Sequence, residues 1–321
     1  MTAFLTKLTG GKVLVMGRAG MDLYPDPPGT KTADATRFVA GLGGSAGNIA
    51  AALSRAGTST ALITCVSDDP IGRFTRSQLA LYGIDATYVR TVGGEARNTL
   101  AIAESVLEGH ETVVYRNGAA DFQMDMSDVA RVDFAQFAAL VTAGTVLASQ
   151  PSRDAALGAF AKAANSGCLT VFDIDYRPYS WPSPEVASAV LSQAGEAADI
   201  IVGNDDEFGF MAGGYDKGMD HARALAAKGK LVIYKMGHKG AITLFEGAEV
   251  LTPPYPVTAL KPIGAGDAFL GTLLGALTMG VSLDTAVHRG AAAAAIVVSR
   301  VGCALNTPTP TEIDDFLASR S

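Results

Sequence analysis

The sequence is poor in cysteine, with only Cys65, Cys168 and Cys303 among its 321 residues. They are odd in number and far apart, and they lie in apolar stretches without the short spacings of metal ligands. This pattern excludes a disulfide framework and a cysteine-rich metal site. It predicts three buried free thiols in a protein of a reducing compartment.

Positive charge is scarce as well. Lys and Arg number 25 against 32 Asp and Glu, so the formal net charge is −7. A nucleic-acid-binding surface needs a basic patch, and the sequence has none, which argues against a nucleic-acid partner. A small anionic substrate stays open, because a pocket can be locally basic on an acidic protein.

Long hydrophobic runs are absent. The longest, at about 291–298, is much shorter than the roughly 20 residues that a membrane helix needs. Residues 1–12 lack the apolar core of a secretory signal. Hydrophobic residues still make up 48% of the chain and charged residues only 18%, which is the composition of a chain that buries a large core. We therefore expect a soluble, cytoplasmic protein with no membrane partner.

Short apolar runs alternate with helical patterns along most of the chain. We expect strands at 13–16, 61–66, 145–148, 169–174, 199–202 and 231–234. We expect helices at 48–55, 72–82, 154–165, 184–197 and 219–227. This alternation predicts an α/β fold with a mostly parallel sheet flanked by helices on both faces.

Two segments interrupt the alternation. The first, at about 22–42, is rich in Pro, Thr and Gly, and the second, at about 88–118, reads as successive strands, including 99–106 and 112–116. We expect both to form a small β-sheet lid over the carboxyl ends of the core strands, where ligands bind in parallel sheets. The prediction is one domain over 1–321 with this discontinuous lid.

The strongest local motif is Gly264-Ala265-Gly266-Asp267, which precedes an apolar helical pattern. The glycines allow the backbone to approach a ligand closely, and amides at a helix start attract an anion. Asp267 could accept a proton from a hydroxyl beside that anion. Phosphoryl transfer requires this combination of charge-stabilising amides and an orienting carboxylate. The alternative is an Asp that only caps a helix.

A second glycine-rich segment contains Gly43, Gly44 and Asn48 and runs into the helix expected at 48–55. Its amides and the Asn48 side chain suit a polyhydroxyl ligand, although glycine-rich turns before helices are common. Asp22 follows the first strand and could hold two hydroxyls, or it could be a solvated loop residue. The dinucleotide-binding glycine spacing is incomplete after this strand, which disfavours an NAD-dependent oxidoreductase.

Polar residues follow two later strands. Asn204 and Glu207 lie directly after the strand at 199–202, and their oxygen-rich side chains suit a hydrated Mg²⁺. A solvated acidic turn that caps the next helix fits them equally well. Lys235 and Gly237 follow the strand at 231–234. They lie at the ligand-binding end of the sheet, although Lys235 could be an exposed loop lysine.

These motifs occur in a characteristic order along the chain: Gly43-Gly44 and Asn48 come first, then Asn204, Glu207, Lys235 and Gly237, and last the Gly264-to-Asp267 motif. In this order they resemble the ribokinase-like carbohydrate kinase family over nearly the whole chain. The resemblance implies a central parallel sheet with a β-sheet lid, a sugar and ATP as substrates, Mg²⁺ as cofactor, and a homodimer through the lid.

The resemblance also implies a role for each matching position. Asp267 matches the catalytic base, and the amides of Gly264, Ala265 and Gly266 match the anion hole for the phosphoryl group. Asn204 and Glu207 match residues that organise Mg²⁺ and its waters. The matching sugar contacts are Asp22, Gly43, Gly44 and Asn48. The matching nucleotide contacts are Asn204, Glu207, Lys235, Gly237 and Gly302.

Lys261 and Pro262 stand where the family usually has Asp-Thr, and this departure leaves a monovalent-cation requirement open. The version Lys261-Pro262-Ile263-Gly264 is similar to that of the family's 5-dehydro-2-deoxygluconokinases, the sugar-acid kinases of myo-inositol breakdown. Four further segments are similar to theirs: Gly17-Arg18-x-Gly20-x-Asp22-Leu23-Tyr24-Pro25, Tyr115-Arg116-x-x-Ala119-Ala120-Asp121, Asp173-x-Asp175-Tyr176-Arg177-Pro178-x-x-Trp181 and Gly203-Asn204-x-x-Glu207-Phe208. The segment with Arg177 also resembles 2-keto-3-deoxygluconate kinases.

Two arginines support an acid substrate on chemical grounds. Arg116 ends an expected lid strand and Arg177 follows a core strand, and a guanidinium suits a sugar carboxylate. We therefore expect ATP-dependent phosphorylation of a primary hydroxyl of 5-dehydro-2-deoxygluconate. The alternatives are 2-keto-3-deoxygluconate, a neutral ketose as for a fructokinase or ribokinase, and, more remotely, a non-catalytic sugar or nucleotide sensor.

Overall fold

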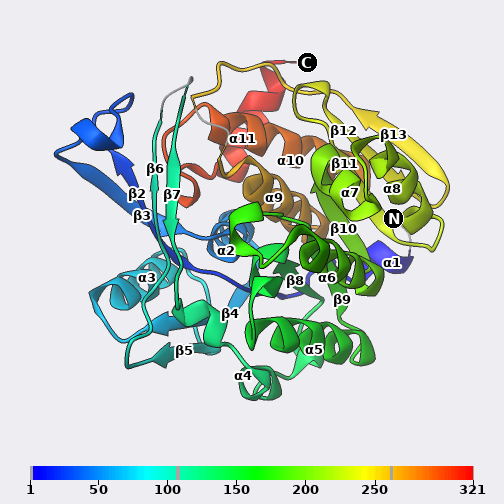
Figure 1. The fold of residues 1–321 in the computed structure, drawn as a ribbon. Coiled ribbons are helices and arrows are strands. Elements are labelled where there is room, and N and C mark those ends of the chain that lie inside the picture. The colour runs from blue at the N-terminus through cyan, green and yellow to red at the C-terminus, as the bar shows by residue number, and fades with distance from the viewer. Residues whose placement is uncertain (1–2, 106–108, 261–262, 321) are drawn as a thin grey trace.

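The computed structural model of the chain describes residues 3–105, 109–260 and 263–320, and a nine-stranded sheet forms its centre (Figure 1). The strands lie in the order β13 (Ala248–Thr252), β12 (Ala241–Phe245), β11 (Leu231–Lys235), β10 (Ile200–Asn204), β9 (Leu169–Asp173), β8 (Ala139–Ala143), β1 (Val13–Met16), β4 (Thr60–Ser67) and β5 (Val89–Val92). From β11 to β5 all neighbours are parallel, whereas β12 and β13 continue the sheet antiparallel.

Both faces of this sheet are covered, and the central strands β1, β4, β8 and β9 are therefore buried at every position and mostly apolar. In β1, Leu14 and Met16 belong to one hydrophobic cluster, and Val13 and Val15 belong to the other. Successive side chains of a strand point to opposite faces, so a continuous apolar run supplies both layers.

Helices form the two outer layers (Figure 1). One layer consists of α4 (Met126–Ala130), α5 (Ser152–Asn165), α6 (Pro184–Ala197), α7 (Asp205–Ala212) and α8 (Gly218–Ala226). The other consists of α1 (Ala3–Thr6), α2 (Ser45–Arg55), α3 (Pro70–Leu81), α9 (Ala265–Thr278) and α10 (Leu283–Val298), with α11 (Pro310–Ala318) packed on α10. Within this layer α2 and α9 pack so closely at Gly271 that any side chain there would collide with α2: a Cβ on Gly271 would lie only 2.4 Å from the Ala52 Cβ.

A second sheet projects from the core at the left of Figure 1. Its strands lie in the order β3 (Phe38–Gly43), β2 (Gly20–Pro25), β6 (Leu100–Ala103) and β7 (Thr112–Tyr115). β2 pairs antiparallel with β3 and parallel with β6, and β6 pairs antiparallel with β7. We refer to these four strands as the lid. The structure thus confirms the predicted fold class, including the small second sheet.

Most predicted elements occur at or near their expected positions. The strand at 13–16 and the helix at 184–197 match to the residue. All three cysteines are buried free thiols, as predicted. Among the described residues, no helix is both long enough and apolar enough to cross a bilayer.

Three predictions about strands need correction. The strand expected at 145–148 is wrong, because residues Gly144–Ala148 form a 3-10 helix and the strand is β8, just before it. Gly144, the first residue of this 3-10 helix, lies against the backbone after β9: a Cβ there would lie 2.1 Å from the Ile174 carbonyl oxygen. Both stretches are buried and mostly apolar, and periodicity alone does not separate them.

The other two corrections concern the edges of the main sheet. β5 pairs with β4 in this sheet rather than with the lid, and β12 and β13 were not predicted. Val106 and Glu108, in the expected lid segment, lie outside the described residues.

Candidate active site

Two helices begin side by side at the centre of the molecule. Gly44 precedes α2 and Gly264 precedes α9, and each has a φ of +85°. This left-handed conformation is readily adopted only by glycine. At Gly264 a Cβ would also lie 2.7 Å from the Cys303 Sγ. The free amides at such helix starts favour an anion.

Asp267 lies in the first turn of α9 and contacts α2 directly. The Asn48 side-chain amide donates a 2.8 Å hydrogen bond to Asp267 Oδ2. Burial, with a further contribution from the negative charge of Asp175, raises the pKa of Asp267 to about 7. A carboxyl group with this pKa is suited to accept a proton near neutral pH.

Asp175 organises the neighbouring part of the site. It follows β9 with a φ of +36°, a conformation that is uncommon for a residue with a side chain. The Ser45 hydroxyl donates a 2.5 Å hydrogen bond to one Asp175 oxygen, and Arg177 Nη2 lies 2.7 Å from the other. Burial opposes ionisation, but Arg177 and Ser45 hold the pKa of Asp175 below its ordinary value. Arg177 itself remains 46% exposed.

A further ion pair joins a partly buried lysine to a buried aspartate. Lys235 Nζ is 3.8 Å from Asp173 Oδ1. It is also only 3.2 Å from where a Cβ on Gly266 would lie, so the ammonium is beside the amides at the start of α9. Burial raises the pKa of Asp173 to about 8 despite Lys235. The pKa of Lys235 is raised, because burial opposes its charge less than the surrounding carboxylates, Asp173 foremost, favour it.

Asn204 and Glu207 form the cap that the sequence left as an alternative. The Asn204 side chain accepts the Glu207 amide, and Glu207 Oε2 accepts the Asn204 amide, each at 2.8 Å. Glu207 Oε1 also accepts the Tyr176 amide at 3.1 Å. Within the described ranges, no group of three or more His, Cys, Asp or Glu side chains is arranged to hold a metal directly. Glu207 is nevertheless buried, and its negative charge is one of those that favour the charged form of Lys235.

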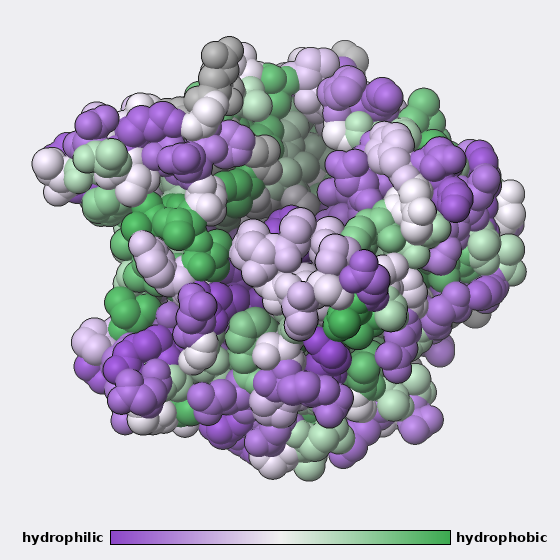
Figure 2. All heavy atoms as spheres, viewed as in Figure 1, coloured by the Kyte–Doolittle hydropathy of each residue, from purple (hydrophilic) through white to green (hydrophobic). Residues whose placement is uncertain are grey.

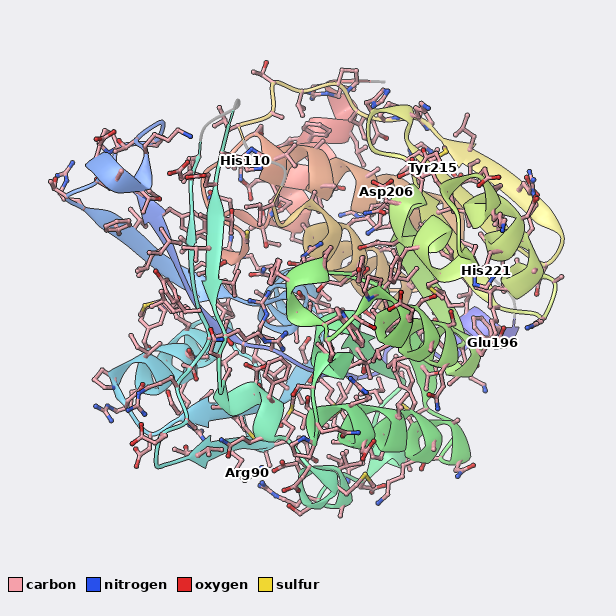
Figure 3. The ribbon with its side chains drawn as sticks, in the orientation of Figure 1. Arg90, His110, Glu196, Asp206, Tyr215 and His221 are labelled. Carbon is pink, nitrogen blue, oxygen red and sulfur yellow. The ribbon has the colours of Figure 1, made fainter. Side chains whose placement is uncertain are left out.

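Asp206, the neighbour of Glu207, is exposed and lies near Tyr215 (Figure 3). Tyr215 donates a 2.8 Å hydrogen bond to Asp205. The acidic run at the start of α7 therefore divides between a buried Glu207 and two residues of the outer surface.

The base of the lid brings Asp22 together with the early glycines. A Cβ on Gly43 would lie 1.9 Å from Asp22 Oδ1, so this approach requires glycine. The Tyr24 hydroxyl donates a 3.1 Å hydrogen bond to Asp22 Oδ2 and accepts the Cys303 amide at 3.1 Å. Asp22 is a buried residue of β2 rather than the solvated loop residue of the alternative reading.

Arg116 is more deeply buried than a residue at the end of a lid strand suggests. Its Nη2 lies 2.5 Å from Asp121 Oδ2, its Nη1 donates to the Thr145 carbonyl at 2.9 Å, and its guanidinium lies 3.9 Å from the centre of the Phe122 ring. Burial lowers the pKa of Arg116. Its hydrogen-bonding capacity is thus largely used within the protein.

The remaining predicted positions lie at the edges of this region. Gly237 begins a 3-10 helix one residue after β11, and Gly302, with a φ of +105°, precedes Cys303. Lys261 lies outside the described residues. His110, at the far end of the lid, is labelled in Figure 3.

Sequence reasoning missed three polar residues of the site: Ser45, Asp173 and Asp175. The signal was present, since Asp173 and Asp175 stand at alternate positions where β9 ends. Carboxylates at the carboxyl end of a central parallel strand lie where such sheets bind ligands. Ser45 has no comparable signal, because its role depends on Asp175, 130 residues away.

Comparison with known proteins gives this geometry a context. The sequence pattern of the pfkB family of carbohydrate kinases matches residues 11–310. The chain belongs to the pfkB family of carbohydrate kinases. The predicted family, enzyme class and fold are thereby confirmed.

Curated relatives extend along nearly the whole kinase. A 5-dehydro-2-deoxygluconokinase of Photobacterium profundum is 36% identical over 313 residues, which cover 96% of this chain and 95% of the relative. The enzyme of the same name from Bacillus subtilis is 31% identical over 316 residues, covering 96% of each chain.

Solved structures share the fold. A PfkB protein from Polaromonas has a TM-score of 0.82 at 26% identity, with 94% of this chain and 99% of that chain covered. A ribokinase II described as putative, from E. coli and in complex with ATP and Mg²⁺, has a TM-score of 0.85 at 21% identity, with 96% and 99% covered.

Proposed function

We propose that this kinase transfers the γ-phosphoryl group of ATP to a primary hydroxyl of 5-dehydro-2-deoxygluconate. The observation that carries the proposal is the position of Asp267, in the first turn of α9, hydrogen-bonded to Asn48 and raised in pKa to about 7. The acid substrate is supported by the relatives of that name, which match over 95% or more of this chain.

In the proposed mechanism Asp267 accepts the proton of the attacking hydroxyl as its oxygen bonds to the γ-phosphorus. The bond from this phosphorus to the bridging oxygen of ADP breaks. The amides of Gly264, Ala265 and Gly266, at the start of α9, stabilise the charge on the moving group. Lys235 adds a cation beside Gly266. Asn48 orients the Asp267 carboxylate toward the acceptor.

Substrate contacts follow from the two glycine-rich segments and the arginines. We assign the sugar hydroxyls to Asp22, Gly43, Gly44 and Asn48. Arg116 and Arg177 add positive charge, since both interact electrostatically with Asp175. The nucleotide is assigned to Asn204, Glu207, Lys235, Gly237 and Gly302.

Magnesium enters this proposal as part of the substrate MgATP and screens the triphosphate charge when bound. The cap formed by Asn204 and Glu207 suits contact with the magnesium ion through water. Both Glu207 oxygens already accept backbone amides, and direct coordination of the ion would compete with these hydrogen bonds. Glu207 and Asn204 would then hold water molecules of the ion.

We further propose that the chain acts as a single domain and forms a homodimer through the lid. Large hydrophobic side chains are exposed on the lid strands, namely Phe38, Val39, Val113 and Tyr115. In Figure 2 the outer end of the lid is largely hydrophilic, and hydrophobic residues lie below it, toward the core. Sedimentation of wild type and Val39→Glu tests this: we expect a dimer and a monomer, and a monomeric wild type contradicts it.

The experiment that tests the proposed function measures phosphorylation by the purified kinase with MgATP. The acceptors are 5-dehydro-2-deoxygluconate, 2-keto-3-deoxygluconate, fructose and ribose. We expect the highest kcat/KM with the first and a loss of roughly 10²–10⁴-fold in Asp267→Asn. Asp206→Asn, at the outer surface of α7, is the matched control.

Each alternative has its own signature in this assay. Preference for a neutral ketose removes the acid substrate and keeps the role of Asp267. Full turnover by Asp267→Asn removes the assigned base. Sugar binding without any phosphate transfer favours a sensor.

A further inference from the structure

Three arginines bring positive charge to the site, and they differ in how that charge is compensated. Arg116 is paired with Asp121, and Arg177 is paired with Asp175. Arg18 has no such partner: within the described ranges its side chain makes no ion pair or hydrogen bond, and its Nε is buried without a hydrogen-bond acceptor. Buried donors are rarely left unpaired in proteins, because the lost hydrogen bond is costly.

Arg18 is fixed in the middle of the site by its backbone. It follows Gly17 at the carboxyl end of β1, and its carbonyl accepts the Gly47 amide at 3.1 Å. A Cβ on Gly44 would lie 2.5 Å from that carbonyl oxygen. Arg18 therefore lies against the glycine-rich start of α2, the segment assigned to the sugar hydroxyls.

The charged groups around Arg18 are those of the reaction site. Arg18 acts electrostatically on Asp175 and Asp267, and it also acts on Arg116. Because Ser45 and Arg177 already occupy the two Asp175 oxygens, and Asn48 one oxygen of Asp267, these carboxylates have partners of their own. The Arg18 guanidinium keeps its donors for another group.

We propose that Arg18 binds the carboxylate of the sugar-acid substrate and sets the preference of this kinase for an acid over a neutral sugar. This inference rests on the proposed function. A guanidinium presents parallel N–H donors that match the two oxygens of a carboxylate. Binding the carboxylate at Arg18 and the hydroxyl at Asp267 uses opposite ends of one six-carbon chain. It also gives the buried Nε an acceptor.

Arg116 and Arg177 then have a different part. Their internal carboxylates hold them in place, so they contribute positive potential rather than the pairing itself. A carboxylate bound by Arg177 would have to compete with Asp175 at 2.7 Å. The specificity-determining residue is the arginine whose donors are unpaired.

The test compares wild type with Arg18→Met and Arg18→Lys, using MgATP and 5-dehydro-2-deoxygluconate. A hydrogen-bonded charged group contributes about 1.5–3 kcal/mol, so we expect Arg18→Met to lose roughly 10–150-fold in kcat/KM for the acid, mainly through KM. Arg18→Lys keeps the positive charge but lacks the paired N–H donors of a guanidinium, so its kcat/KM should lie between those of Arg18→Met and wild type. The KM for MgATP should change less than about threefold, because a carboxylate contact leaves the triphosphate untouched.

Arg37→Met is the matched control, since Arg37 is 72% exposed on the lid side and pairs with Asp26. Thermal unfolding of each variant shows whether it folds, and a variant that does not fold is replaced by Arg18→Gln. An acid kcat/KM within threefold of wild type in a folded Arg18 variant overturns the inference alone. A loss seen mainly in the KM for MgATP also overturns it, because Arg18 would then contact phosphate. A wild type that phosphorylates only neutral sugars overturns the proposed function and this inference together.

Discussion

Asn48 and Asp267 are 219 positions apart in the sequence, and their side chains are joined by a 2.8 Å hydrogen bond. Each belongs to a different glycine-rich segment, and each lies near the start of a helix that a left-handed glycine precedes. The bond therefore fixes the proposed base with respect to the residues assigned to the sugar. It also lowers the pKa of Asp267, against the larger effect of burial.

Removal of this bond should move the pH dependence of the reaction. In wild type we expect kcat/KM to rise with pH through about 7, since Asp267 must lose its proton before it can act as a base. Asn48→Ala removes the donor, so the pKa of Asp267 should rise and the acid limb should shift to higher pH. We expect a loss of about tenfold or more at pH 7 and a smaller one at pH 9. Asn165→Ala, at the exposed end of α5, is the control, and an unshifted limb in Asn48→Ala contradicts the prediction.

The raised pKa of Asp267 also predicts how stability depends on pH. A carboxyl group whose pKa is raised by folding stabilises the protein while it is protonated. That contribution is complete below the unfolded pKa of about 4, declines as pH rises above it, and is lost once pH passes the folded pKa, here about 7. Asp267→Asn removes this loss. The variant should therefore be more stable than wild type at pH 8, by about 1–3 kcal/mol, and the difference should shrink toward pH 5.

Denaturant unfolding at both pH values measures this difference. The Asp206→Asn variant, whose carboxyl is exposed, should show no such change. Equal stability of Asp267→Asn and wild type at pH 8 would show that burial does not penalise the Asp267 charge.

The sequence predicted the site where a motif was local and left it incomplete where partners are distant. The segments Gly264 to Asp267 and Gly43-Gly44 can be recognised from the sequence alone, because close backbone approach requires glycine. The alternation of strands and helices then places both segments at the carboxyl end of the sheet. Ser45 and Asp175 could not be paired this way, since nothing local to either residue indicates the other.

Two further differences have local physical causes. The stretch that forms β8 and the 3-10 helix after it is buried and mostly apolar, so composition did not show where the strand ends. The close packing of Gly144 on the Ile174 carbonyl lies at this boundary and has no counterpart in the local sequence. Arg116 was predicted from its place at the end of a lid strand. Its pairing with Asp121, five residues later, depends on the turn of the intervening chain.

The close approach of Gly43 to Asp22 predicts a defect in sugar binding. In Gly43→Ala the new Cβ would lie 1.9 Å from Asp22 Oδ1, so the carboxylate must move away from its position at the base of the lid. We expect the KM for the sugar to rise by roughly 10-fold or more, with a smaller change in the KM for MgATP. Gly93→Ala is the matched control, because a Cβ there meets nothing within 4 Å. An unchanged sugar KM in Gly43→Ala would remove Asp22 from the assigned sugar contacts.

The Lys235–Asp173 pair allows binding and stability to be separated. Lys235→Met removes a cation beside Gly266 and leaves the Asp173 carboxyl, buried, without its partner. We expect kcat/KM for MgATP to fall by roughly 10²-fold. Above pH 8, where Asp173 ionises in wild type, stability should fall by about 1–3 kcal/mol, because the buried carboxyl has lost the cation that favours its charge. Adding Asp173→Asn removes this carboxyl, so above pH 8 the double variant should regain stability without regaining activity. Lys239→Met, exposed in the following turn, is the control. If the double variant recovers both properties, Lys235 serves only to compensate Asp173, and its assignment to the nucleotide is wrong.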